Sequence, residues 1–98
     1  MKPPDEPLIR RALGAEILRR RKALGLLQRQ VWERAGLAKN VYLRLERAER
    51  NALVHQLIAV AIGLDTTAGE LLGGALDRIA RGDVPSAGDE WRAAFGVE

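Results

Sequence analysis

The 98-residue sequence contains no cysteine, a single histidine, a single serine and no long apolar run. Without cysteine the chain forms neither disulfides nor thiolate metal sites, which is typical of a reducing compartment. No apolar stretch approaches the ~20 residues that a membrane-spanning helix needs. The first residues, MKPPDEP, lack the apolar segment of a signal peptide. We therefore expect a cytoplasmic protein with no membrane partner.

The residue types that most often carry catalysis and metal binding are scarce as well. His55 has no cysteine or clustered carboxylates near it in the sequence, and Ser86 has no neighbouring base. Gly73-Gly74 lacks the lysine and the preceding strand of a phosphate-binding loop. The sequence thus offers no catalytic residue, metal ligand or cofactor site, and we do not expect an enzyme.

Charge is distributed unevenly along the chain, although the net charge is only +3. Residues 1–50 hold 13 Lys and Arg against 6 Asp and Glu, whereas residues 51–98 hold 3 against 7. A basic half beside an acidic half suggests one surface that faces a polyanion and another with a different role. Charges that merely keep a small helical protein in solution would give the same totals.

Apolar residues recur at helical spacing nearly throughout, so the sequence predicts an all-α fold. We expect helices over residues 8–24, 28–35, 39–48, 52–64 and from 67 onward, interrupted at Gly73-Gly74 and resumed over 75–81, with a weaker last helix that carries Trp91 and Phe95. This organisation predicts a flexible Pro-rich arm (1–7), a compact five-helix domain (8–73) and a C-terminal helical extension (74–98).

The helix expected over 39–48 has two distinct sides. One is an apolar stripe formed by Ala38, Val41, Tyr42, Leu45 and Ala48, and the other contains Lys39, Asn40, Leu43, Arg44 and Arg47. Gly36 allows a sharp turn between this helix and the one before it. Two short helices joined in this way are the parts of a helix-turn-helix motif.

The polar side of this helix has the chemistry that reads base edges in a major groove. Lys39 and Arg44 can donate to guanine, and Asn40 can pair with adenine. Gln28 begins the preceding helix, where free amides favour a phosphate, and Arg29 and Arg47 flank these positions as candidates for backbone contacts. The alternative is an ordinary solvated helix face, which every exposed helix has.

The segment over residues 13–72 resembles the Cro and lambda-repressor-like family of xenobiotic-response-element regulators. The resemblance runs without a gap and depends on the succession of residues rather than on one motif. The matching residues are Leu13-Gly14, Ile17, Arg21-Lys22, Gly25-Leu26, Gln28, Glu33-Arg34-Ala35-Gly36-Leu37, Leu45-Glu46-Arg47, Arg50-Asn51, Leu57, Ala61, Leu64 and Glu70-Leu71-Leu72.

The resemblance implies a helix-turn-helix domain in which Gln28, Lys39, Asn40 and Arg44 contact DNA. It also implies an ion pair between Arg21 and Glu46. The chain departs from the family at several positions. The family usually has Ser or Thr where Leu27 and Ala38 stand, a small residue at Trp32, Gly at Ala48 and Pro at Ala52.

The helix expected over 52–64 is apolar nearly all round. Its predicted core stripe is Val54, Leu57, Ile58, Ala61 and Leu64. Leu53, Val60 and Ile62 lie outside that stripe and need a cover. Trp91 and Phe95 could cover them within the chain, or the same surfaces could meet across a two-fold axis; we expect a homodimer.

These observations predict a sequence-specific DNA-binding transcriptional regulator, a repressor, whose partner is double-stranded DNA. The alternative is a helix-turn-helix-derived module that binds a protein partner, such as an antitoxin or an accessory factor. In that case Leu27, Trp32, Leu43 and Leu53 would have made its surface apolar, and DNA binding would be weak or lost.

Overall fold

Five helices form the secondary structure of residues 2–86, which are the residues that this computed structural model describes. They are α1 (Glu6–Ala23), α2 (Gln28–Ala35), α3 (Lys39–Glu46), α4 (Val54–Gly63) and α5 (Ala68–Arg81). No strand occurs in this part of the chain. The expected compact, all-α architecture with five helices is therefore confirmed.

Local sequence signals account for where the helices begin and end. Asp5 accepts a hydrogen bond from the N–H of Leu8 (2.9 Å) and caps α1, and Thr67 caps α5 through the N–H of Glu70 (3.1 Å). α1 is followed by Gly25, α2 by Gly36 and α5 by Gly82, all with positive φ. Because α2 and α3 are separated by only residues 36–38, their relative orientation is set by this tight turn.

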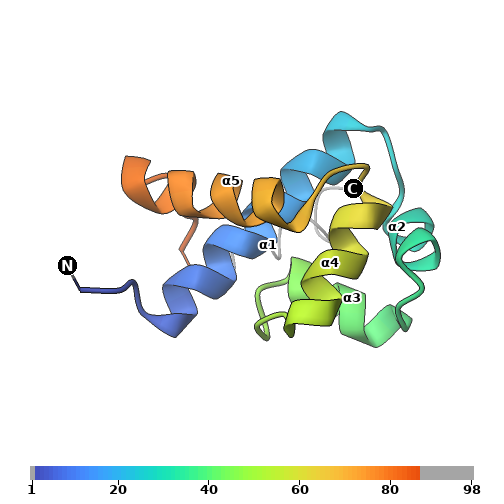
Figure 1. Ribbon diagram of the computed structural model, residues 1–98, viewed down its shortest axis with the longest axis horizontal. Helices are drawn as coiled ribbons and strands as arrows, with labels where there is room; N and C mark the ends of the chain where they lie inside the picture. The colour runs from blue at the N-terminus through green and yellow to red at the C-terminus, as the bar shows by residue number, and fades with distance from the viewer. Residues whose placement is uncertain (1, 87–98) are drawn as a thin grey trace.

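The helices pack in two groups that share one core. α1 lies against α5 and also contacts α3, while α2 lies mainly against α4 (Figure 1). α1 and α3 approach closely, because a Cβ atom on Gly14 would lie 2.9 Å from the carbonyl oxygen of Glu46. The largest fully buried side chains are Ile17, Val31, Tyr42, Leu45, Glu46, Val60 and Leu71.

The orientation of α4 differs from the expected one. Val54 and Ile58, which were predicted to be core residues, are 75% and 45% exposed, whereas Val60 is fully buried. Ala61 and Leu64 are buried as predicted. The backbone of Gly63 lies against α2, where an added Cβ would be 3.0 Å from the Val31 carbonyl oxygen. Since nearly every side chain of α4 is apolar, this close approach, not the hydrophobic pattern, decides which face is buried.

The predicted interruption at Gly73-Gly74 is wrong, because α5 continues through both glycines to Arg81. The domain boundary placed after residue 73 therefore lies inside a helix that packs along α1. Within residues 2–86 no single helix is long and apolar enough to cross a membrane. Only α4 and α5 together reach that length and hydropathy, across a bend of 98°.

Candidate nucleic-acid interface

The third helix presents one side to solvent and buries the other. Lys39, Asn40 and Arg44 are exposed. The buried residues of α3 are Tyr42, Leu43, Leu45 and Glu46. The three residues predicted to contact bases therefore lie on the free side of α3, near its N-terminal end and middle.

Leu43 is placed differently from the prediction, which assigned it to the outward stripe. Its side chain is only 7% exposed and belongs to the core cluster. The physical reason is that α3 contacts both α1 and α2, so its buried face is wider than a single apolar stripe. This burial leaves Leu43 with little surface to offer an apolar partner.

Asn40 and Arg44 are not engaged by other side chains. Neither side chain forms a hydrogen bond or an ion pair with another residue of the described part of the chain. Many other arginines there are paired with an acid, among them Arg10 with Glu6 and Arg34 with Asp65. The donors of Asn40 and Arg44 are thus available to an external ligand at no cost in internal bonds.

A hollow of about 500 Å³ lies along this side of α3. Its lining residues are Lys39, Asn40, Leu43, Arg44, Arg47 and Glu49. Three of them are cationic and one is acidic, so the hollow is net basic. Arg47 is half-buried and forms an ion pair with Glu49, with 3.9 Å between Arg47 Nη1 and Glu49 Oε1.

A buried ion pair ties α3 to α1. Arg21 of α1 donates from Nε and Nη2 to the two carboxylate oxygens of Glu46 at 2.9–3.2 Å. The two side chains are 4% and 0% exposed. Arg21 also donates from Nη1 to the Leu26 carbonyl oxygen (2.9 Å), which fixes the turn before α2.

Two further side chains complete the polar network around Glu46. The Tyr42 hydroxyl donates to Glu46 Oε2, and Gln28 Nε2 donates to Oε1 (3.2 Å). Burial and the neighbouring negative charge of Glu46 raise the pKa of Tyr42 above its usual range, so the hydroxyl keeps its proton. The network joins α1, α2 and α3 through one carboxylate.

The predicted backbone-contact residues do not all lie together. Gln28 is half-buried and donates one amide N–H to Glu46, so only its second amide N–H remains for a phosphate contact. Arg29 is exposed on α2 and pairs with Glu33 (3.1 Å). Only Arg47 lines the same hollow as the α3 residues.

The residues predicted to form a dimer or cover surface are only partly exposed. Leu53 and Ile62 are 54% and 63% exposed, as the hypothesis requires. Val60 is a core residue and is no longer part of that surface. Trp91 and Phe95 lie outside the described residues.

Sequence reasoning missed a second buried carboxylate, Glu16, which is only 3% exposed. It accepts hydrogen bonds from Arg19 (2.7 Å), Arg20 (2.8 Å) and Arg78 (2.9 Å) and thereby ties α1 to α5. The spacing of Glu16 to Arg19 and Arg20 was a signal for the first two contacts. Nothing local pointed to Arg78, because it is 62 residues away.

Comparison with protein-family models, curated proteins and solved structures finds no match. The interpretation of the interface therefore depends on the chain's own residues and geometry. Within residues 2–86 no group of three or more metal-ligating side chains is placed to hold an ion. The exposed polar side of α3 is the candidate site.

Proposed function

We propose that this chain is a lambda-repressor-like helix-turn-helix domain that binds double-stranded DNA and inserts α3 into the major groove. The observation that carries the proposal is the pair of uncommitted donors on α3. The side chains of Asn40 and Arg44 are exposed and form no hydrogen bond or ion pair with another described residue, while Glu46 on the same helix is held by Arg21. A DNA-bound domain at a promoter would act as a repressor by occluding it.

The size and chemistry of α3 support insertion into the groove. Its eight residues span about 12 Å, similar to the ~12 Å width of the major groove. Arg44 and Lys39 match guanine O6 and N7, and Asn40 matches adenine N6 and N7. Arg47, which lines the hollow beside α3, and Arg29, which is exposed on α2, would contact phosphates and set the register without reading sequence.

We propose in addition that the domain acts as a homodimer. Val54, Ile58 and Ile62 are exposed at intervals of four residues along α4, and no charged residue occurs in that helix. Burial of such a face against the same face of a second copy would remove apolar surface from water. Two copies could then reach half-sites about one turn of DNA apart.

Selection of binding sites from random duplex DNA, at low and at near-physiological salt, tests the DNA-binding proposal. We expect enrichment of a defined sequence by the wild-type protein. Arg44→Ala and Asn40→Ala should each lose preference at one or two base positions, by about 5- to 100-fold per good bidentate contact. Affinity should fall steeply as salt rises, because contacts to phosphates release counterions.

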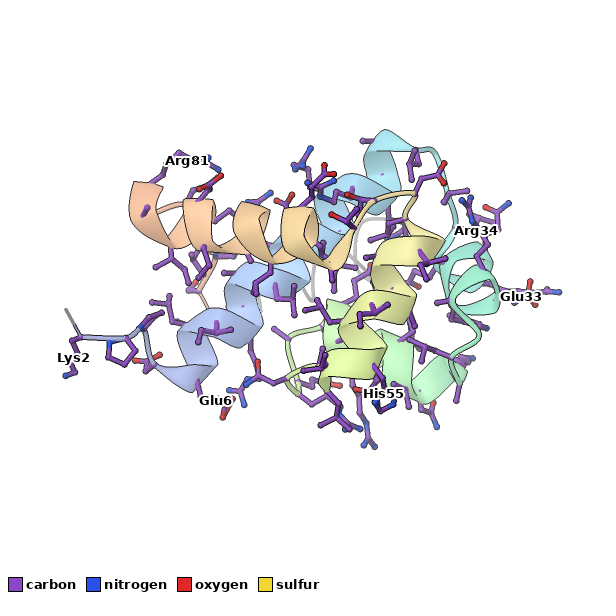
Figure 2. The ribbon with its side chains drawn as sticks, in the orientation of Figure 1. Lys2, Glu6, Glu33, Arg34, His55 and Arg81 are labelled. Atoms are coloured by element: carbon purple, nitrogen blue, oxygen red, sulfur yellow. The ribbon has the colours of Figure 1, made fainter. Side chains whose placement is uncertain are left out.

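Arg81→Ala is the matched control for Arg44→Ala. Arg81 is also an exposed helix arginine, but it lies at the C-terminal end of α5, away from α3 (Figure 2). It should leave the selected sequence unchanged. No enrichment by the wild-type protein at low salt contradicts the proposal.

A second candidate function, a protein-binding module, is favoured by the exposed leucines at two helix starts. Leu27 and Leu53 are 68% and 54% exposed at positions where a polar cap is usual. Such a module would bind its partner with little dependence on salt. Arg44→Ala would leave that binding unchanged, whereas a paired Leu27→Ser and Leu53→Ser variant would weaken it.

A further inference from the structure

Trp32 on α2 contacts both the turn that follows its helix and the first residue of α3. Its carbonyl oxygen accepts a hydrogen bond from the N–H of Leu37 (3.0 Å) in the turn between the two helices. Its ring lies under the side chain of Lys39, with the ammonium nitrogen 5.9 Å from the ring centroid. The same residue thus contacts the turn and the first exposed cation of the candidate interface.

The Trp32 ring is itself held from the other side. It lies 6.3 Å from the ring of Tyr42, tilted by 52°, in the distance range of favourable aromatic pairs. Tyr42 is fully buried, and its hydroxyl donates to Glu46. An unbroken series of contacts therefore joins the buried Arg21–Glu46 pair, Tyr42, Trp32 and Lys39.

We propose that Trp32 is a positioning residue that sets the base preference contributed by Lys39. This inference rests on the proposed DNA-binding function. A lysine side chain has four rotatable bonds, and ordering it on binding costs conformational entropy. The face of the indole ring attracts the ammonium group of Lys39. The N–H donors of the ammonium that point away from the ring remain free for a guanine edge. The Lys39 side chain is therefore partly ordered before DNA binds, so that less conformational entropy is lost on binding.

The position of Lys39 can be tested on the free protein. Trp91, which lies outside the described residues, is replaced by Phe so that Trp32 is the only indole. Proton NMR should then show upfield ring-current shifts of the Lys39 side-chain methylenes. Trp32→Leu should abolish these shifts and Trp32→Phe should reduce them, while both variants keep the helical circular dichroism spectrum. Unchanged shifts in Trp32→Leu overturn the proposal.

The role in base preference is tested by site selection with Trp32→Leu, Lys39→Met and the double variant. We expect Trp32→Leu to lower the preference at the base position that Lys39→Met affects, by about two- to fivefold. When Lys39→Met is already present, adding Trp32→Leu should not lower the preference at that base position any further. The position affected by Arg44→Ala should keep its preference, which a general loss of structure would not allow.

The outcomes separate this inference from the function on which it rests. If the wild-type protein and Trp32→Leu enrich the same sites with equal preference, the role of Trp32 is wrong and DNA binding stands. Loss of preference at all positions together, including that of Arg44, assigns Trp32 a structural role and also overturns the inference. No enrichment by the wild-type protein overturns the proposed function and the positioning role together.

Discussion

The guanidinium of Arg21 and the carboxylate of Glu46, 25 residues apart in the sequence, form a buried ion pair between α1 and α3. Every partner that Glu46 has in the described chain lies on α1, α2 or α3. Because desolvation of two charges offsets much of their attraction, such a pair fixes helix orientation more than it adds net stability. Removal of only one of the two charges, however, leaves the other buried without a partner and is destabilising.

Replacement of Glu46 by Gln should destabilise the protein strongly. The variant leaves the Arg21 charge buried without its counter-charge, which typically costs about 3–5 kcal/mol. Urea unfolding followed by circular dichroism measures the free energy of unfolding. The matched control is Glu33→Gln, which breaks the exposed Arg29–Glu33 pair and should change stability by about 0.5 kcal/mol or less. Equal effects of the two substitutions would contradict this account of Glu46.

Stability should fall with acidification partly through Glu16. Burial raises the pKa of this carboxyl, but hydrogen bonds from Arg19, Arg78 and Arg20 outweigh burial and lower the pKa from 4.5 to about 2. A carboxyl group whose pKa is lower in the folded than in the unfolded protein stabilises the folded state at pH values above its unfolded-state pKa. This contribution to stability is lost as the pH falls from about 5 towards 2. The contribution at neutral pH is on the order of 3 kcal/mol.

Glu16→Gln tests this pH dependence directly. We expect the variant to be less stable than the wild type at pH 7, with a difference that narrows between pH 5 and pH 2. Urea unfolding at pH 7, 4 and 3 measures the difference at each point. A constant difference across this range would show that the carboxylate charge is not what Arg19, Arg20 and Arg78 recognise.

The two adjacent glycines of α5 should respond in opposite ways to the same substitution. A Cβ on Gly74 would lie 2.5 Å from Glu16 Oε2, whose carboxylate is buried and held by arginines, so Gly74→Ala should destabilise by about 1–3 kcal/mol. A Cβ on Gly73 meets nothing within 4 Å, so Gly73→Ala should stabilise by about 0.5–1 kcal/mol through helix propensity. Thermal unfolding of the two variants gives the comparison, and stabilisation by both would contradict the close approach of Glu16.

Ala48 follows α3 with a φ of 61°, a left-handed conformation that glycine adopts without steric cost. Ala48→Gly should therefore stabilise the protein by roughly 0.5–1 kcal/mol, net of the added freedom of the unfolded chain. Ala80→Gly, within α5, is the control and should destabilise by about 1 kcal/mol. Destabilisation by both substitutions would show that Ala48 is not strained.

Much of the fold could be predicted from local residues. α2 has the expected bounds, Gln28–Ala35, because Gly36 ends it in a left-handed conformation. α3 starts at Lys39 as expected and ends two residues early, at Glu46. The exposed positions of Lys39, Asn40 and Arg44 also follow the predicted polar stripe. These features depend on residues within one or two turns of helix, which the sequence displays directly.

Caps, glycines and helical periodicity act over a few residues, so local sequence is enough to predict most helix bounds and the polar side of α3. The burial of Val60 and the exposure of Ile58 depend on helix packing, because α4 is apolar nearly all round and its contacts with neighbouring helices determine which face is buried. The contact between Arg78 and Glu16 and the continuation of α5 through its two glycines likewise depend on packing between helices. Contacts between residues far apart in the chain have no local pattern, since they depend on how whole helices pack.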